Sequence, residues 1–557
     1  MTTTADLFLR RRDRDDIAFH FETGALTYGE LAAGIERRAR FWESIRDDSR
    51  PPHIGVLLDN VPEYVLWLGA AAVTRSVVVG INATYRGEEL ARLIDHSDCQ
   101  CIVTSATYGG LLDVVETSVA PTMVVRVDDE RYLDGIPLAP APADRPAAED
   151  DDLFLLIFTS GSTNFPKAVR CTQGRFARTG AHVTTIADLR PGDAVYAPLP
   201  FFHSSSLFTG MSAALNAGVP LGTRARFSAS KTLPDIRRIG ASLLTYTGKV
   251  LNYILTVPED PTDADNPLRQ AIGNEASERD IERFSARFGC RIRDSYGSTE
   301  GMIIIRRDAS MPAGALGTAD PGVVVLDPAT GAECPRLRRG PDGRPLNAAD
   351  AVGEMVHTAP VSGFEGYYRN EEATVERFRD GYYWSGDLAY RDDDGWFYFA
   401  GRSNEWLRVD SENFAAGPVE AILGRYPGVR SVAVYAVPDD PVGDRVMAAL
   451  ELDHGTRFDA DGFDRFLAHQ PDLGPKWIPS FVRVSPDLPK LASMKIDKTA
   501  LRRAAWTASD TYWRPGRDLP LRPLADVDRA SLARVLPGHR NPDIDHGPTT
   551  KSTSTLR

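Results

Sequence analysis

The chain has 557 residues, of which 42% are hydrophobic, 25% charged and 9% aromatic. This composition is that of an ordinary globular protein and argues against a disordered chain, a collagen or a disulfide-rich miniprotein. Acidic residues outnumber basic ones by 77 to 64, which gives a formal charge of −13. No general basic field is therefore available to hold a polyanion, and nucleic acid is not expected as a partner.

We expect neither a membrane span nor export. The longest apolar run, residues 65–73, is far shorter than the roughly 20 residues that a membrane-spanning helix needs. Residues 10–16 are all Arg or Asp, where a secretory signal would need its apolar stretch. An odd number of cysteines without metal-ligand spacing fits a reducing, cytoplasmic location. These cysteines are Cys99, Cys101, Cys171, Cys290 and Cys334.

The first 160 residues alternate short apolar runs with helix-like stretches, which is typical of a mostly parallel α/β sheet. The predicted strands are residues 54–58, 77–81, 101–103, 123–127 and 153–159. A buried crossover helix is predicted over residues 63–73 and an amphipathic helix over residues 87–95.

Further along the chain the pattern changes twice. Residues 314–350 are rich in Gly, Pro and Asp, and strands at 354–357 and 381–384 then predict an antiparallel or mixed sheet. A smaller α+β region starts near Arg402. Its predicted elements are strands at 430–437 and 446–452 and a helix at 459–469.

Residues 155–167 have the composition of a phosphate-binding loop. They run from an apolar strand into small hydroxyl residues, one glycine and Lys167. Such a loop offers backbone N–H groups, hydroxyls and one cation to a polyphosphate. It is not a Walker loop, because no G-x-x-x-x-G-K-[S/T] occurs in the chain. Taken alone, an exposed Ser/Thr-rich turn fits these residues equally well.

Three further segments follow in order: DSYGSTEG at residues 294–301, YWSGD at 383–387, and Lys495. With the loop, they resemble the adenylate-forming superfamily of acyl-CoA synthetases, nonribosomal adenylation domains and luciferases, over roughly residues 20–510. Residues 245–249, 273–276 and 411–413 look most like the fatty-acid-transport-protein and very-long-chain acyl-CoA synthetase branch, and the soluble bacterial fatty-acyl-CoA synthetases also fit.

The resemblance implies an acetyl-CoA synthetase-like α/β fold in two domains. The large N-terminal AMP-binding domain, with mixed and parallel sheets, is expected to span residues 1–403. A small, mobile α+β domain of residues 404–525 would carry Lys495, because such domains swing between two half-reactions. Residues 526–557 form a polar tail that has little to bury and is expected to be partly disordered.

The implied activity is an ATP- and Mg²⁺-dependent ligase that joins a fatty or other apolar carboxylic acid to CoA through an acyl-adenylate. The partner is thus a small-molecule acid, and a homodimer stays an alternative. Bringing a carboxylate onto a polyphosphate needs a cation aimed at the transferring group. The resemblance gives this role to Lys495, with Lys498 as the rival, and gives Mg²⁺ to Glu300, whose oxygens suit that ion. Without the resemblance, we would interpret Lys495 as a surface lysine and Glu300 as a helix-capping residue.

The resemblance also assigns the substrate contacts. His203 falls beside the substrate carboxylate, although a buried core histidine fits as well. Residues 207–219 form either the wall of the acyl pocket or a core helix. The nucleotide contacts are Thr159, Ser160, Gly161, Ser162, Thr163 and Lys167 for the phosphates, with Thr159 also catalytic; Gly273, Asn274, Glu275, Ala276, Ser295, Tyr296, Gly297, Ser298 and Thr299 for the adenine end; and Asp387 and Arg402 for the ribose.

Two departures from the family pattern bear on the second half-reaction. Asn404 stands at the hinge position, which is usually Asp or Lys. Ser411 replaces a glycine at which the backbone approaches the pantetheine arm, so its Cβ could narrow the thiol tunnel. A second hypothesis therefore keeps adenylation but transfers to a carrier-protein thiol or an amine, or activates an unusual acid such as nitrite. A third is a non-catalytic nucleotide-binding relative.

Overall fold

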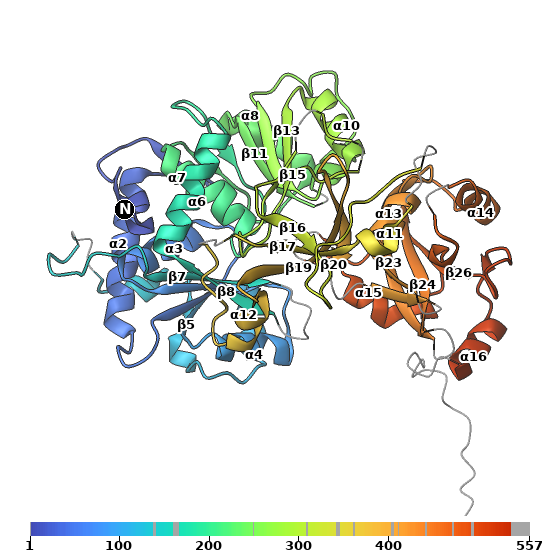
Figure 1. Cartoon of the computed structure of the whole chain (residues 1–557). Coiled ribbons are helices and arrows are strands. Elements are labelled where there is room, and N and C mark those ends of the chain that lie inside the picture. The colour runs from blue at the N-terminus through green and yellow to red at the C-terminus, as the bar shows by residue number, and fades with distance from the viewer. Residues whose placement is uncertain are drawn as a thin grey trace, which may run out of the picture. The chain divides into compact units, whose positions relative to one another are not determined.

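The computed structural model divides into two compact units (Figure 1). Unit 1 comprises Met1–Val324, Val356–Ser385 and Ala492–Lys495, and unit 2 comprises Val325–Met355, Gly386–Leu491 and Ile496–Arg557. The residues described are 2–136, 141–159, 166–248, 250–307, 310–312, 314–340, 346–359, 363–402, 406–409, 412–439, 443–470, 473–491 and 495–535. Within these ranges, we find no helix that is long and apolar enough to cross a bilayer.

A six-stranded sheet of order β6-β5-β3-β4-β7-β8 confirms the parallel α/β prediction for the start of unit 1. Its first five strands pair in parallel, and β8 then pairs antiparallel with β7. The strands are β3 (His53–Leu57), β4 (Val77–Gly80), β5 (Cys99–Thr104), β6 (Val124–Arg126), β7 (Leu153–Thr159) and β8 (Lys167–Thr172).

A nine-stranded sheet of order β15-β14-β13-β12-β11-β9-β10-β1-β2 completes unit 1. The neighbouring strands β11, β12 and β13 run parallel, so their carboxyl ends meet at one edge of the sheet. The strands are β1 (Ile17–His20), β2 (Ala25–Thr27), β9 (Val195–Tyr196), β10 (Leu221–Gly222), β11 (Leu243–Thr247), β12 (Gln270–Asn274), β13 (Arg291–Tyr296), β14 (Ile305–Arg306) and β15 (Thr318–Ala319).

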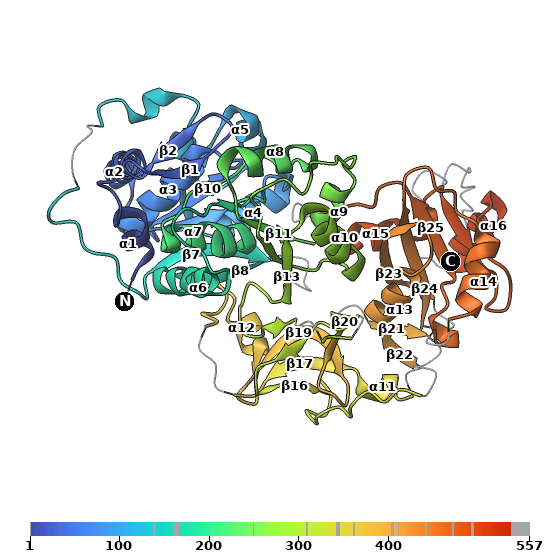
Figure 2. The ribbon, with the colours of Figure 1, turned by 90° about the horizontal axis from the view of Figure 1, so that it is seen from above.

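Helices pack against both sheets of unit 1. The predicted crossover helix is α3 (Pro62–Val73), which has proline in its first turn and is buried almost all round, and the predicted amphipathic helix is α4 (Gly87–His96). Helices α8, α9 and α10 build one apolar cluster with β11 (Figure 2). The other helices are α1 (Thr4–Leu9), α2 (Tyr28–Ile45), α5 (Ala106–Leu112), α6 (Gln173–Ile186), α7 (Ala213–Ala217), α8 (Ala229–Ile239), α9 (Val250–Leu255), α10 (Glu278–Phe288), α12 (Glu371–Arg377), the 3₁₀ turns η1 (Pro121–Met123) and η2 (Glu130–Leu133), and the π-helix η3 (Ser205–Ser212).

A five-stranded sheet of order β16-β17-β19-β18, with β20 also paired to β19, begins within the Gly/Pro-rich stretch. Its pairs β18–β19 and β19–β20 are antiparallel, which confirms the prediction of a mixed or antiparallel sheet. Its elements are β16 (Val323–Leu326), α11 (Ala348–Ala351), β17 (Gly353–His357), β18 (Phe378–Arg379), β19 (Tyr382–Arg391) and β20 (Phe397–Arg402).

The C-terminal part of unit 2 is built on a seven-stranded sheet with its own apolar core. The two predicted strands and the predicted helix of this region are present as β23, β24 and α14. Residues 526–535, at the start of the predicted tail, form α16. The elements are β21 (Trp406–Val409), β22 (Glu412–Ala415), α13 (Ala416–Leu423), β23 (Val429–Asp439), β24 (Gly443–Leu452), α14 (Ala460–Ala468), η4 (Pro475–Trp477), β25 (Phe481–Ser485), α15 (Lys498–Ala504), η5 (Ala505–Thr507), β26 (Thr511–Trp513), β27 (Arg522–Pro523) and α16 (Asp526–Val535).

Candidate active site

The two ends of the predicted phosphate loop are held together by a β-hairpin. Thr159, the last residue of β7, pairs with Lys167, the first of β8, and its hydroxyl lies 3.4 Å from the Lys167 carbonyl oxygen. Residues 160–165, which include Ser160, Gly161, Ser162 and Thr163, lie outside the described residues. The Lys167 side chain is only 6% exposed, and its ammonium lies 3.7 Å from a carboxylate oxygen of Glu376. The loop therefore carries a largely buried cation at its base.

Glu300 is a buried carboxylate held by a tyrosine. Glu300 is 7% exposed, and the Tyr367 hydroxyl donates a 2.7 Å hydrogen bond to its Oε1. The Arg377 Nε–H donates to the same hydroxyl over 3.2 Å. Burial, and then the charge of Glu300, raise the pKa of Tyr367. The hydroxyl thus stays protonated, and the carboxylate is fixed in one orientation.

The backbone of the turn that carries Glu300 is fixed by an arginine of α6. The Arg175 guanidinium, in a residue that is 8% exposed, donates to the carbonyl oxygens of Thr299 and, over 3.0 Å, of Glu300. The Thr299 hydroxyl also lies 3.1 Å from the hydroxyl of Ser204. The turn is therefore tied to α6 and to the segment that follows His203.

The four residues predicted to line the adenine slot lie at the carboxyl end of β12. Gly273 has no room for a side chain, because a Cβ there would lie 2.2 Å from the Tyr246 carbonyl oxygen. The Asn274 side-chain oxygen is buried without a hydrogen-bond partner among the described residues. Glu275 has φ +64°, a left-handed conformation that costs free energy in a non-glycine residue. Ala276 follows this turn.

The second adenine segment lies beside the first. Ser295 and Tyr296 end β13, the strand next to β12, and the Ser295 hydroxyl lies 3.4 Å from the Gly273 carbonyl oxygen. Gly297 and Ser298 follow the strand and are exposed. The structure therefore brings both predicted adenine segments to the same edge of the nine-stranded sheet, beside the turn that carries Glu300.

His203 is half-buried and packs against Phe202, with 5.0 Å between the ring centroids. Burial, and then the charge of Lys495, lower the pKa of His203 to about 4. The imidazole is therefore neutral at physiological pH. Residues 205–217 form η3 and α7, and Leu207, Met211 and Leu215 belong to the main core of unit 1. The core interpretation of this stretch is thus confirmed, while a wall of the acyl pocket stays a prediction.

The structure separates the two candidate lysines. Lys495 belongs to unit 1, where its ammonium forms an ion pair with Glu275 of the adenine segment. Lys498 belongs to unit 2, where it begins α15 and lies 2.9 Å from Glu420. Only Lys495 is thus associated with a predicted nucleotide contact among the described residues.

The predicted ribose residues are neighbours in unit 2. Asp387 of β19 pairs with Arg402 of β20 across the two strands. The Gly386 N–H donates to Glu354 over 2.6 Å, and Gly386 has φ +75°, which favours glycine. The side chain of Arg402, together with Asn404 and Ser411, lies outside the described residues.

Sequence reasoning missed the residues that position Glu300. Tyr367 lies 67 residues from it, and Arg175 lies 125 residues away. Neither belongs to a motif that we recognised, and their roles arise only when the chain packs. The signals in the sequence are weak: Tyr367 is one of two adjacent tyrosines, and Arg175 stands in an otherwise ordinary helix.

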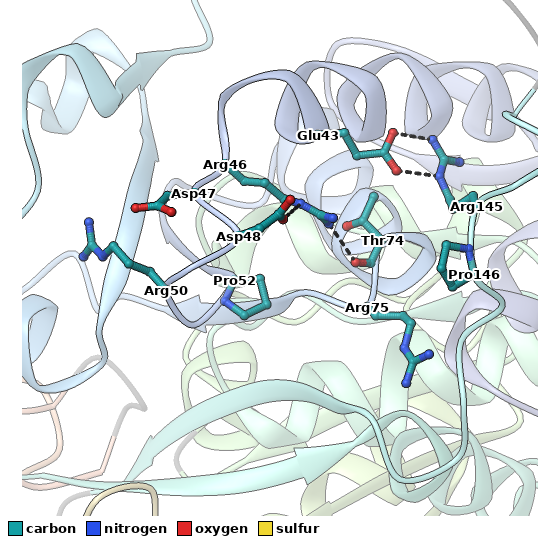
Figure 3. A pocket seen from close by; sticks show the side chains of 10 residues that line it. All are labelled: Glu43, Arg46, Asp47, Asp48, Arg50, Pro52, Thr74, Arg75, Arg145 and Pro146. Carbon is teal, nitrogen blue, oxygen red and sulfur yellow. Dashed lines mark hydrogen bonds and ion pairs between the residues drawn. The ribbon is translucent and has the colours of Figure 1, made fainter.

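A separate hollow of about 230 Å³ lies elsewhere in unit 1 (Figure 3). Three of its arginines form ion pairs: Arg145 with Glu36 and Glu43, Arg46 with Asp48 over 2.8 Å, and Arg75 with Asp152 over 2.8 Å. Most of the positive charge around the hollow is therefore already paired with carboxylates. It is not part of the nucleotide site.

The chain matches the family model described as AMP-binding enzyme over residues 9–368 and the model of its C-terminal domain over residues 418–495. It is 41% identical to a steroid-22-oyl-CoA synthetase of Rhodococcus jostii, covering 97% of this chain and 98% of that protein. It is 42% identical to the medium/long-chain-fatty-acid–CoA ligase FadD17 of Mycobacterium tuberculosis, covering 92% and 98%.

Solved structures show the same fold. A benzoate CoA ligase of Burkholderia xenovorans has a TM-score of 0.76 at 22% identity, with 90% of this chain and 100% of that chain covered. ATP-bound MatB of Rhodopseudomonas palustris has a TM-score of 0.74 at 24% identity, with 90% and 99% covered. The predicted acetyl-CoA synthetase-like fold is therefore confirmed.

The fold and the site define an ATP-dependent, adenylate-forming enzyme. The chain belongs to the AMP-binding enzyme family, and its class within that family is the AMP-forming acid–thiol ligase, an acyl-CoA ligase that works through an acyl-adenylate. The predicted family and enzyme class are thus confirmed.

Proposed function

We propose that this ligase activates a hydrophobic carboxylic acid, of the fatty or steroid side-chain type, and transfers it to CoA. The relatives named above act on acids of these two kinds by their names, and both align over nearly their whole length. The single observation that supports this proposal is that Lys167, Glu300 and the adenine segment 273–276 all lie within unit 1.

The residues present fit a purine nucleotide. The buried, unpaired oxygen of Asn274 is an acceptor, and an unpaired buried acceptor is costly unless a ligand satisfies it. The exocyclic amino group of adenine is a donor of the required kind. Lys167 supplies a cation at the base of the phosphate loop, and we assign Ser160, Gly161, Ser162 and Thr163 to the same phosphates.

The residues also fit Mg²⁺. Glu300 offers a hard carboxylate oxygen, and Tyr367 holds the other oxygen of that carboxylate, so its orientation is set in advance. When bound, Mg²⁺ would screen the negative charge of the phosphates. We assign Asp387 and Arg402 to the ribose, since adjacent strands hold them side by side.

The reaction proceeds in two half-reactions, each with its own leaving group. In the first, an oxygen of the substrate carboxylate attacks the α-phosphorus, and the bond from that phosphorus to pyrophosphate breaks. In the second, the thiolate of CoA attacks the acyl carbonyl carbon, and AMP leaves. Two anions meet in the first step, so a cation must lie near the transferring group. His203, neutral at physiological pH, can hydrogen-bond to the acid without adding charge.

We assign the mobile cation of the first step to Lys495 rather than to Lys498. Lys495 forms an ion pair with Glu275 of the adenine segment. Lys498, the first residue of α15, instead forms an ion pair with Glu420. A lysine that stabilises its own domain is less free to move to a substrate. This assignment makes Lys498 a matched control, three residues away and of the same chemistry.

The test uses pure protein, ATP, CoA and a panel of fatty, bile-type and aromatic acids, with AMP and acyl-CoA measured. We expect AMP and an acyl-CoA for an apolar acid; formation of ADP, or no exchange of labelled pyrophosphate into ATP with any acid, would contradict the proposal. Lys495→Ala should lose adenylate formation by about 100-fold or more but still convert supplied acyl-adenylate with CoA. Lys498→Ala should adenylate normally, and equal losses in both variants would show that the lysine is wrongly assigned.

The cysteines support a cytoplasmic location for this enzyme. All five are free and buried. Burial raises the pKa of Cys101 and of Cys171 to about 12, so these thiols are not reactive. Five unpaired cysteines are typical of a protein that works in a reducing compartment.

A further inference from the structure

Unit 2 contains a buried carboxylate, Glu451, that is not among the residues assigned to the active site. Glu451 is 2% exposed and belongs to β24, which pairs with β23 on one side and with β25 on the other (Figure 2). It lies opposite Ser431 of β23 and Ser485 of β25, and both serines are buried as well. Burying a carboxylate costs free energy unless it is paired and hydrogen-bonded. The groups that surround Glu451 therefore indicate what the carboxylate holds in place.

The first of these groups is an arginine that stands at a bulge. The register of β23 against β24 shifts between Val429 and Ser431, which leaves Arg430 as an extra residue on β23. A bulge of this kind redirects the side chain that it carries. The Arg430 guanidinium, in a side chain that is 10% exposed, forms an ion pair with Glu451 and donates to the Pro486 carbonyl oxygen over 3.1 Å. Arg430 thus connects the carboxylate to the chain that leaves β25.

The carboxylate also holds this chain directly. Oε2 of Glu451 accepts a 3.3 Å hydrogen bond from the Leu488 N–H, and the Lys490 ammonium lies 3.6 Å from Oε1. The same ammonium forms an ion pair with Asp487. Residues 486–490 are therefore held along their length by one buried acid, either directly or through Arg430.

These residues are one side of a stem whose other side follows Lys495. Lys490 and Ile496 form an antiparallel bridge, and the Asp497 N–H donates to the Pro489 carbonyl oxygen over 2.8 Å. Ile496, which is bonded directly to Lys495, packs against an apolar cluster of unit 2. We call residues 486–490 and 496–497 the stem, and all of them belong to unit 2. The stem thus fixes the backbone immediately after Lys495.

We propose that Glu451 is a positioning residue for adenylation: through the stem, it fixes the backbone from which the Lys495 side chain reaches the transferring group. The inference rests on the proposed function, in which Lys495 is the cation of the first half-reaction. Glu451 itself touches no substrate and moves no proton. Its effect arises because a catalytic group that is misplaced by about 1 Å can lose about 100-fold in rate, even when the change lies far from the chemistry.

Glu451→Gln is the first test, because it keeps the shape of the side chain and one acceptor oxygen but removes the charge that Arg430 and Lys490 pair with. We expect the exchange of labelled pyrophosphate into ATP to fall about tenfold or more, up to the loss expected for Lys495→Ala. Conversion of supplied acyl-adenylate with CoA should stay within about twofold of the parent, since Lys495 has no role in that half-reaction. General damage to unit 2 would slow both half-reactions.

A double variant tests whether Glu451 acts through Lys495. If it does, Glu451→Gln should cost little further exchange activity in a Lys495→Ala background, because the group that it positions is already gone. Two independent effects would instead multiply, since the free energies of uncoupled sites add. A double variant whose loss equals the product of the two single losses would overturn the inference.

Asp464→Asn is the matched control. Asp464 of α14 also accepts from an arginine, Arg514, over 2.6 Å and from a backbone N–H, that of Leu521, over 2.8 Å. The same chemical change is thus made in the same unit at a carboxylate that has no hydrogen bond or ion pair to the described residues of the stem. Both half-reactions should stay within about twofold of the parent. A loss of exchange in this control equal to that of Glu451→Gln would contradict the proposal.

Lys490→Ala keeps the inference testable if Glu451→Gln does not fold. It removes one of the two cations that pair with Glu451 and leaves the backbone bridge to Ile496 in place. We expect exchange to fall about threefold while thioester formation is unchanged. Parental exchange rates in a folded Glu451→Gln, or in Lys490→Ala if the first variant is unfolded, would overturn the inference.

Hydrogen exchange of the peptide that covers residues 486–497 separates this inference from the proposed function, because it needs no substrate. Protection of this peptide should fall in Glu451→Gln and not in Asp464→Asn. If the parent activates no acid, the proposed function is wrong, and unchanged protection would then refute the stem as well. If Lys495→Ala loses adenylation while Glu451→Gln keeps both adenylation and protection, the positioning role is wrong and the ligase proposal stands.

Discussion

The hydrogen bond between Tyr367 and Glu300 gives the sharpest prediction about catalysis. Tyr367→Phe removes one oxygen atom from a residue that is 4% exposed and leaves the packing of the ring in place. The 2.7 Å bond that is lost has a charged acceptor, and bonds of this kind contribute about 1.5–3 kcal/mol. The free energy of unfolding of unit 1 should therefore fall by about that amount.

The effect on Mg²⁺ should be separate from the effect on stability. Without the hydroxyl, the Glu300 side chain gains rotational freedom that it must lose again to bind a cation. Fixing such a side chain costs about 0.5–1.5 kcal/mol, so the Mg²⁺ concentration at half-maximal adenylation should rise about two- to tenfold. The assay is pyrophosphate exchange at saturating ATP and acid over a Mg²⁺ titration.

Tyr368→Phe is the matched control. The Tyr368 hydroxyl donates to Asp98 over 2.8 Å, so the same chemical change is made one residue further along the chain. We expect this variant to lose stability but to keep the Mg²⁺ dependence of the parent. An unchanged Mg²⁺ titration for Tyr367→Phe, or an equal shift in both variants, would refute the positioning of Glu300 by Tyr367.

Three further predictions follow from burial, close packing and charge. The pKa of His203 is lowered to about 4, so the unfolded chain binds more protons than the folded protein between pH 6.5 and 4. As the pH is lowered through this range, the free energy of unfolding of the parent, measured with urea, should therefore fall more than that of His203→Gln. Gly273→Ala places a Cβ 2.2 Å from a backbone oxygen, so AMP binding by calorimetry should be lost. Arg145→Ala leaves Glu43 without its cation, and Glu36 with Arg40 alone, and should cost about 3 kcal/mol in urea unfolding while AMP formation is unchanged.

The sequence alone predicted most strands of the first sheet and, through the resemblance, the class of enzyme. The alternation of apolar runs and helix-like stretches is a local property, since side-chain periodicity follows directly from backbone geometry. The strands and helices of the first sheet were predictable for this reason, and the order of the motifs identified the family. The ends of the phosphate loop, Thr159 and Lys167, were also predictable, because a hairpin joins residues that are close in the chain.

Only the tertiary structure decided which distant side chains act together. Tyr367 reaches Glu300, Arg175 fixes the turn that carries it, and Tyr246 reaches Asp294 across Gly273, over separations of 48 to 125 residues. No local pattern encodes such pairs, because they depend on strand order and register, which arise when the whole core packs. Likewise, the resemblance favoured Lys495 but left Lys498 as a rival, and only the folded chain shows that their ion-pair partners differ.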